Sequence, residues 1–292
     1  TQTLGLVVTN TLYHGVYFSE LLSHAARLTE DRGRQLILAD GKHSAEEERQ
    51  AIQYLLDSRC DGVIIYPRFL SVEEMDELIE QHSQPIMVLN RRLRRHPAHC
   101  VYSDQQAAAA AVVERLVGMG HSDIAFITGS ADSPTGMERL AGYREALSRQ
   151  DIPVQEALIA PGKWTPACGA AAVSTLLARG VSFSALIASN DDMAIGAIKQ
   201  LHECGVSVPE QVSVVGFDDI ALAPYVIPSL ASVLKRNLPS KAVSSMLITL
   251  CLSICRVVLA VVLVASHSDL NWRLAIMFTA FLPNQRTPLV CC

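Results

Sequence analysis

The stretch "CVYSDQQAAAAAVVERLVGMGHSDIAFITG", residues 100–129, shows the pattern from which the fold of this chain can be predicted. An alanine-rich segment of helical period, Gln105 to Val117, leads through two glycines to a short apolar run, Ile124 to Ile127. Apolar runs of this length are typical of strands buried on both faces, because helices cover both sides of a parallel sheet. The stretch therefore predicts a helix followed by a strand of a parallel sheet.

The same alternation of strand and helix runs through most of the chain. Apolar runs predict strands at Leu4–Val8, Gln35–Leu38, Gly62–Ile65, Ile86–Leu89, Ile124–Ile127, Ala185–Ala188 and Val212–Val215. Segments of helical period predict helices at Tyr17–Arg32, Ala45–Ser58, Val72–Gln81, Gln105–Val117, Met137–Arg149, Thr165–Leu177 and Asp191–Cys204. Strands that alternate with helices are joined by right-handed crossovers in a parallel sheet. The fold class is therefore predicted to be doubly wound α/β.

The series of strands is too long for one sheet, and it restarts near Asp104. We therefore expect an N-terminal lobe over residues 1–104 and a C-terminal lobe over residues 105–233. Ligands of open parallel sheets bind beyond the carboxyl ends of the strands. Two such edges that face each other would form a ligand-binding cleft between the lobes.

Residues 234–292 differ in composition from the rest of the chain. They contain no glycine, a single acidic residue (Asp269) and half of the eight cysteines. The apolar stretch Met246–Ala265 is long enough to span a membrane. Arg256 lies near its middle, however, and would cost about 2.5 to 3.5 kcal/mol there. We therefore favour a buried or misread segment over a membrane span.

Composition and motifs exclude several classes of function. The net charge of -5 gives no overall basic field for nucleic acid or for an acidic membrane. The cysteines show no metal-ligand spacing, so we expect reduced thiols of a cytoplasmic protein, with no metal site and no cofactor. The N-terminus shows no signal peptide, although a mature secreted protein would look the same. The chain contains no nucleophile, zinc or phosphate-loop motif, so we expect no enzyme.

Polar and aromatic side chains gather where the predicted strands end and the next helices begin. Amide, carboxylate and guanidinium groups can each bind neighbouring hydroxyls, and aromatic rings can cover the C–H face of a sugar ring. This set predicts a site for a neutral polyol such as a sugar. Its members are Asn10, Tyr17, Phe18, Asn90, Arg91, Arg139, Trp164, Asn190, Asp191 and Asp218.

Each member of this set also has a structural explanation. Asn190 and Asp191 stand where they could cap the following helix. Arg139 could pair along its own helix with Glu138 or Glu145. The aromatic members also suit a hydrophobic core. All members of the set lie where predicted strands end or the next helices begin, and this shared position favours a binding site over separate structural roles.

Several stretches of the chain resemble the lactose/galactose repressor (LacI/GalR) family of bacterial transcription regulators, and its galactose-type branch in particular. The resemblance covers residues 1–233 almost without a gap. The stretches that carry it are "TLGLVVTN", "GRQLILADGKHSAEEERQAIQYLLDSRCDGVII", "GMGHSDIAFITG", "ERLAGYREAL", "ASNDDMAIGAIKQLHECGVSVPEQVSVVGFDDI" and "IPSLASV".

The resemblance implies a fold and a set of site residues. The fold would be two flavodoxin-like lobes of the periplasmic-binding-protein-like type I, with the effector between them. Asp218 would accept hydrogen bonds from sugar hydroxyls, with its charge balanced by Arg139. Ser133 and Thr135 would be peripheral contacts. The ligand-binding residues carried over from the family are Tyr17, Phe18, Asn90, Arg139, Trp164, Asn190 and Asp218.

The resemblance also implies a function, that of a sugar-responsive repressor of a carbohydrate operon. Within the family the chain is most similar to the type of repressor that controls a β-glucoside operon. The chain would be the effector-binding and dimerisation region of a cytoplasmic homodimer. Operator DNA would be bound through an N-terminal helix-turn-helix domain that lies outside the printed sequence. The family's sequence ends at about Val233, which suggests a frameshifted tail. The alternative is a periplasmic sugar-binding protein of a transport system.

Overall fold

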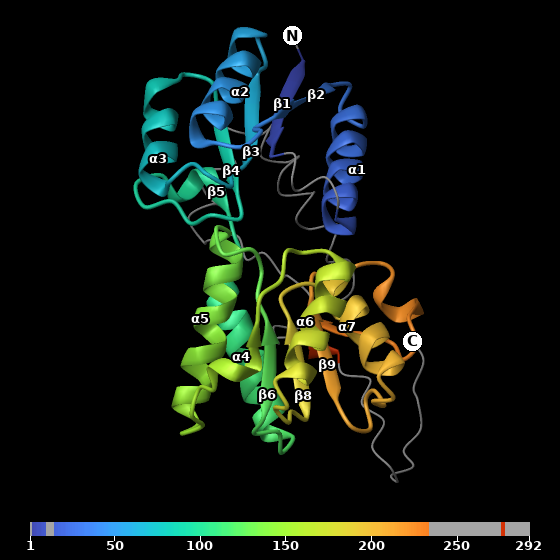
Figure 1. Cartoon of the computed structure of the whole chain (residues 1–292). Helices are drawn as coiled ribbons and strands as arrows, with labels where there is room; N and C mark the ends of the chain where they lie inside the picture. The colour runs from blue at the N-terminus through green and yellow to red at the C-terminus, as the bar shows by residue number, and fades with distance from the viewer. Residues whose placement is uncertain (1, 10–14, 234–275, 278–292) are drawn as a thin grey trace, which may run out of the picture.

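The structure, a computed structural model, describes residues 2–9, 15–233 and 276–277. It shows two α/β lobes, each built on its own sheet, with the chain passing from one to the other after β5 (Figure 1). The predicted fold class of two doubly wound parallel-sheet lobes is therefore confirmed.

The first lobe is a five-stranded parallel sheet with the strand order β2-β1-β3-β4-β5. Its strands are β1 (Thr3–Val8), β2 (Gln35–Asp40), β3 (Gly62–Tyr66), β4 (Ile86–Leu89) and β5 (Cys100–Val101). Its helices are α1 (Val16–Glu30), α2 (Ala45–Asp57) and α3 (Val72–Gln81), with a short 3-10 turn η2 (Pro97–His99).

The second lobe repeats this order in the next part of the chain. Its sheet has the strand order β11-β10-β9-β8-β6-β7. The strands β6 to β10 are therefore arranged in the same order as β1 to β5 of the first lobe. The strands are β6 (Ile124–Ile127), β7 (Ile159–Ala160), β8 (Ala185–Ala188), β9 (Ser213–Phe217), β10 (Ala231–Val233) and the antiparallel β11 (Ile276–Met277). The helices are α4 (Gln105–Gly118), α5 (Pro134–Arg149), α6 (Pro166–Ala178) and α7 (Asp191–Glu203), with 3-10 turns η3 (Glu156–Leu158) and η4 (Ala223–Tyr225).

Each sheet is buried on both faces, which explains why its inner strands read as unbroken apolar runs. In β1, Leu6 and Val8 pack into one cluster of buried residues, whereas Val7 packs into the cluster on the other face. In β6, Ile127 and Phe126 divide in the same way between two clusters. Each lobe thus has two clusters of buried residues, one on either face of its sheet.

All the predicted strands and helices are present, with small differences at their ends. The largest difference is at α5, which begins at Pro134 rather than Met137 because Ser133 caps the helix and proline suits its first turn. The strands β5, β7, β10 and β11 were not predicted, because they are only two or three residues long. Strands this short give no periodic signal.

The chain crosses between the lobes at residues 102–104, where β5 has ended and Asp104 caps α4 by accepting a hydrogen bond from the N–H of Ala107 at 2.8 Å. Most of residues 234–292, including the apolar stretch Met246–Ala265, lies outside the described residues, so the predictions for this tail stay predictions. Within the described residues, no helix combines the length and the apolar character that crossing a membrane requires.

Candidate ligand-binding cleft between the lobes

A cleft of about 630 Å³ lies where the carboxyl ends of the two sheets face each other. Its walls come from the segments that follow β1, β3 and β4 in the first lobe and β6, β7, β8 and β9 in the second. Such strand ends, near the point where the strand order reverses, are where doubly wound sheets bind ligands. Of the residues predicted from the sequence, the cleft brings together Tyr17, Phe18, Arg91, Ser133, Thr135, Arg139, Trp164, Asn190 and Asp218.

Arg139 provides the fixed positive charge of the cleft wall, and only 1% of its surface is exposed. Its guanidinium donates to Gln105 Oε1 at 2.9 Å and to the main-chain oxygen of Ser189, and it lies 3.4 Å from Asp218 Oδ1. Its carbon Cζ lies 4.4 Å from the centre of the Phe217 ring. These contacts hold the cation in one orientation, with Asp218 as its ion-pair partner.

Asp218 adopts a backbone conformation that is rare for a residue with a side chain. Its φ is 109°, and that of Asp219 is 51°. Backbone strain of this kind persists only where the surrounding structure enforces it, and it is common at functional sites. The strain turns the chain sharply after β9 and leaves the Asp218 side chain in the cleft, about 10% exposed.

Aromatic rings from both lobes line the cleft. Phe18 packs edge-on against Tyr17 and against Tyr66, with ring centres 5.2 and 4.8 Å apart. Burial raises the pKa of Tyr66 to about 12, so its hydroxyl keeps its proton at neutral pH. Trp164, with φ of 70°, comes from the opposite lobe and packs closely over Gly129, where even a Cβ atom would clash with the indole. The two lobes thus offer apolar surfaces on either side of the cleft.

Asn190 both caps a helix and lines the cleft. Its Oδ1 accepts a hydrogen bond from the N–H of Met193 at 2.9 Å, which confirms the capping alternative. Its Nδ2 donates to the main-chain oxygen of Trp164 at 3.0 Å. The cap therefore also fixes the loop that carries the indole.

Asn90 and Asp191, which were also predicted, are not among the residues that line the cleft. Asn90 lies just behind the cleft wall. Its Nδ2 donates to the Tyr66 hydroxyl at 2.7 Å and to Thr135 Oγ1 at 2.8 Å, while its Oδ1 accepts from Gln105 Nε2 at 3.1 Å. Gln105 in turn holds Arg139. Asn90 thus joins the first lobe to the second just behind the cleft wall, and direct ligand contact by Asn90 stays a prediction.

Further polar contacts join the lobes at the edges of the cleft. Arg68 forms an ion pair with Asp132 at 2.7 Å. The N–H of Ala221 donates to Glu20 Oε1 at 3.3 Å. Both contacts link residues of different lobes, so a change in the angle between the lobes would have to break or rearrange them.

Several residues that line the cleft were not predicted from the sequence. Tyr66 directly follows the predicted strand Gly62–Ile65. The site was predicted from polar and aromatic residues at strand ends, and the same reasoning would have included Tyr66. Arg68, Asp192 and Lys163 also line the cleft. Burial, followed by the nearby Asp218 carboxyl, raises the pKa of Asp192. Asn10, which was also predicted, lies outside the described residues.

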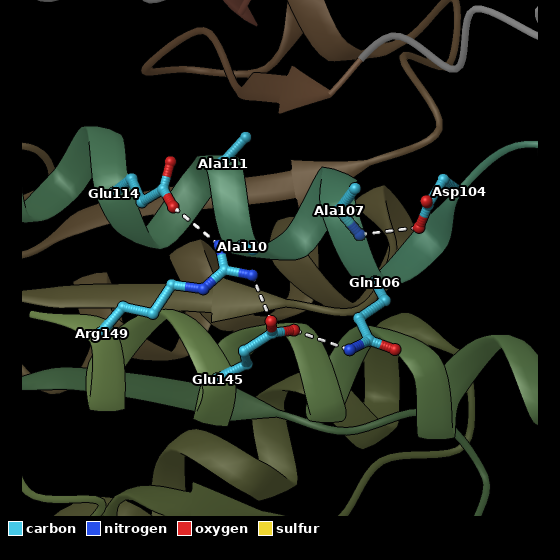
Figure 2. A pocket seen from close by; sticks show the side chains of 8 residues that line it. All are labelled: Asp104, Gln106, Ala107, Ala110, Ala111, Glu114, Glu145 and Arg149. Carbon is cyan, nitrogen blue, oxygen red and sulfur yellow. Dashed lines mark hydrogen bonds and ion pairs between the residues drawn. The ribbon is translucent and has the colours of Figure 1, made fainter.

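A second hollow lies between α4 and α5 on the outside of the second lobe (Figure 2). Its charged groups bind one another, since Glu145 accepts hydrogen bonds from Arg149 and from Gln106 Nε2. The alternative that Arg139 pairs with Glu145 is therefore wrong, because Arg149 takes that place and Arg139 pairs across the fold. This hollow contains none of the predicted ligand-binding residues. Within the part of the chain that the structure describes, no cluster of side chains suits a metal ion.

The cleft combines hydrogen-bonding groups of fixed orientation with aromatic surfaces, a combination that suits a small polar ligand with apolar faces. The fold and the site together define a two-lobed ligand-binding protein of the periplasmic-binding-protein-like class. In agreement, residues 113–255 match the family described as "Periplasmic binding protein-like domain".

Known proteins identify the family. The transcriptional regulator AscG of Escherichia coli K12 is 69% identical over 233 residues, which are 80% of this chain and 69% of AscG. The crystal structure of AscG superimposes with a TM-score of 0.76 at 68% identity, over 80% of this chain and 85% of that chain. A sugar-binding LacI-family regulator from Escherichia coli, solved with phosphate, gives a TM-score of 0.75 at 59% identity over 93% of both chains.

A regulator named CelR, solved in complex with cellobiose, is 29% identical with a TM-score of 0.69, over 88% of this chain and 78% of that chain. The chain belongs to the LacI/GalR family of transcription regulators, as its sequence motifs predicted. As a member of that family it is a transcription regulator, like its close relatives, and not an enzyme. The alternative of a periplasmic transport protein is not favoured, because the close relatives of this chain are transcription regulators.

Proposed function

We propose that the cleft binds a β-glucoside and that this ligand controls the affinity of the repressor for operator DNA. The observation that carries the proposal is a cleft of about 630 Å³ in which the Arg139–Asp218 pair lies between aromatic side chains of both lobes. Pockets for small ligands have volumes of about 300 to 1,000 Å³. The CelR complex supports the choice of sugar, because cellobiose is two glucose units joined by a β-linkage.

The proposed roles follow from the chemistry of each side chain. Asp218 accepts hydrogen bonds from sugar hydroxyls, and Arg139 and Asn190 donate to sugar oxygens. Trp164 covers one face of the sugar ring, with Tyr17 and Phe18 on the side of the other lobe. Because these residues come from both lobes, a bound sugar favours the closed arrangement.

Closure of the lobes links sugar binding to the affinity for operator DNA. In a homodimer whose first lobes carry DNA-binding domains, a change in the angle between the lobes alters the spacing of those domains. That spacing must match the half-sites of the operator. The partners are therefore a β-glucoside, operator DNA bound through an N-terminal domain, and a second copy of the chain.

Calorimetric titration with cellobiose, methyl β-glucoside and the α-linked disaccharide maltose tests the proposal. We expect the β-linked sugars to bind and to change the emission of Trp164, with the signal lost in Trp164→Phe. Asp218→Ala and Arg139→Ala each remove a charged group that hydrogen-bonds the sugar, which costs about 1.5 to 3 kcal/mol of binding free energy. Equal affinity for maltose would contradict the β-glucoside, and unchanged affinity in both variants would contradict the site.

A further inference from the structure

Asp191 is a buried carboxyl group directly behind the loop that carries Asp218. It lies in the first turn of α7, is 0% exposed and is not among the residues that line the cleft. Its Oδ2 accepts a hydrogen bond from the N–H of Ile220 at 3.0 Å, and its Oδ1 accepts one from the Ser232 hydroxyl at 2.6 Å. The absence of a side chain at Gly216 makes room for it, since a Cβ atom there would lie 2.1 Å from Oδ1.

The loop in front of Asp191 needs to be held in place. Asp218 and Asp219 both have positive φ, at 109° and 51°, a conformation that residues with side chains seldom adopt. Left to itself, the loop would relax towards ordinary backbone angles and move the Asp218 carboxyl. Hydrogen bonds from the N–H groups of Asp219 and Ile220, directly after Asp218, oppose that relaxation.

Asp191 supplies the anchor for these hydrogen bonds. The N–H of Ile220 binds Asp191 directly, on the C-terminal side of the strained pair. The Ser232 oxygen accepts the N–H of Asp219 at 2.9 Å while its hydroxyl donates to Asp191. One carboxyl group thus holds two successive N–H groups, one of them through Ser232.

We propose that Asp191 is a positioning residue for the ligand of the cleft, acting through Asp218 without touching the ligand. The sequence motif that contains it reads as a helix cap, but the capping bond is made by its neighbour Asn190. Asp191 instead links α7 to β10 and to the loop after β9. The proposal rests on the binding role given to Asp218 above.

The test uses the full 292-residue chain and three substitutions. Ser232→Ala removes the relay to Asp219 but leaves Asp191 in place. Asp191→Asn is the conservative variant, because its amide can still accept from Ile220 and donate to the Ser232 oxygen. Thr29→Val is the matched control: it removes a buried hydroxyl of the first lobe, whose bond to the Ala25 oxygen at 2.6 Å is remote from the cleft.

Two measurements separate positioning from general stability. Hydrogen exchange of the segment 218–222 in the sugar-free chain should be roughly 10-fold faster in Ser232→Ala, which corresponds to about 1.4 kcal/mol, near the net contribution of one hydrogen bond. Cellobiose affinity, measured well below the unfolding temperature, should fall by a similar factor. Asp191→Asn and Thr29→Val should stay within about 2-fold of the unmodified chain in both measurements.

A double-mutant cycle completes the test. In an Asp218→Asn background, Ser232→Ala should cause little further loss of cellobiose affinity, because both changes act on the same contact. Unchanged exchange in Ser232→Ala, or faster exchange with unchanged affinity, would overturn the positioning role. A chain that binds no β-glucoside would overturn the proposed function itself, and the sugar-free exchange measurement would still show whether the relay from Asp191 through Ser232 holds the loop.

Discussion

The two lobes have the same strand order, yet they hold the loops at the cleft with carboxyl groups in very different surroundings. In the first lobe Glu48 of α2 is 0% exposed and receives a hydrogen bond from each of four donors. Its Oε1 accepts from the Thr9 hydroxyl at 2.6 Å and the N–H of Arg68 at 2.8 Å. Its Oε2 accepts from the N–H groups of Phe69 at 3.1 Å and Leu70 at 2.9 Å. This carboxyl fixes the loop after β3.

In the second lobe Asp191 has the corresponding task with half as many donors. It receives hydrogen bonds from Ile220 and Ser232, and it lies near two other carboxyl groups, those of Asp218 and Asp219. Burial, and then the Asp218 carboxyl, raises the pKa of Asp191 to about 8. The number of hydrogen-bond donors and the neighbouring charges therefore decide how much a buried carboxyl group changes the folding free energy of its lobe.

The largest effect is expected from Glu48→Gln. An amide has one oxygen, so it leaves two of the four donors facing an NH₂ group. Each unsatisfied donor costs about 1 to 3 kcal/mol, so the free energy of unfolding should fall by roughly 2 to 6 kcal/mol. Urea unfolding measures the change, with the exposed Glu46→Gln on the same helix as the control, expected within about 0.5 kcal/mol. A loss below about 1 kcal/mol would show that Glu48 does not hold the loop.

An effect of opposite sign, a gain in the free energy of unfolding, is expected from Asp191→Asn. The folded chain keeps the Asp191 proton up to a pKa of about 8, whereas the ordinary value is 3.8, so ionisation weakens the folded state as pH rises between these values. The stability contribution is fully present below pH 3.8 and falls by at most about 1.4 kcal/mol per pH unit up to about pH 8. The asparagine variant removes this slope and should gain stability relative to the unmodified chain from pH 5 to pH 8.

Urea unfolding of both chains at several pH values measures this difference. The groups that face Asp191 are the carboxyls of Asp218 and Asp219 and the hydroxyl of Ser232, and they are present in both chains. The histidines are also common to both, so their titration cancels. Parallel curves over the whole range would mean that Asp191 is ionised in the folded state.

The smallest effect is expected at helix caps, where the two lobes should behave alike. Ser71 forms a capping box with Glu74 at the start of α3, and the Thr165 side chain accepts from the N–H of Cys168 at the start of α6. Replacing either cap by alanine should lower the free energy of unfolding by about 1 kcal/mol. Cellobiose affinity should be unchanged in Ser71→Ala, whose helix is outside the cleft. A loss of sugar affinity there would show that the first lobe transmits local damage to the cleft.

Much of the fold follows from local patterns in the sequence. Strands such as Ile86–Leu89 are buried on both faces and therefore appear as unbroken apolar runs, and the helices have a clear period and recognisable caps. The position of residues at strand ends also indicated part of the cleft lining, such as Arg139, Trp164 and Asp218, because the carboxyl ends of parallel strands lie at one edge of a sheet. Short strands such as Cys100–Val101 were missed because pairing with a neighbour, not local pattern, defines them.

What the sequence by itself determined was the class of fold, its division into two similar halves, and the residues at the strand ends. Only the tertiary structure decided what each of those residues does. Asn90 is held behind the cleft wall because its amide nitrogen donates to Tyr66 and to Thr135, which come from different lobes. Asp191 looked like a helix cap, but the strand β10 brings Ser232 to it from 41 residues away. Contacts between residues so distant in sequence depend on how the sheets are assembled, and no local pattern records them.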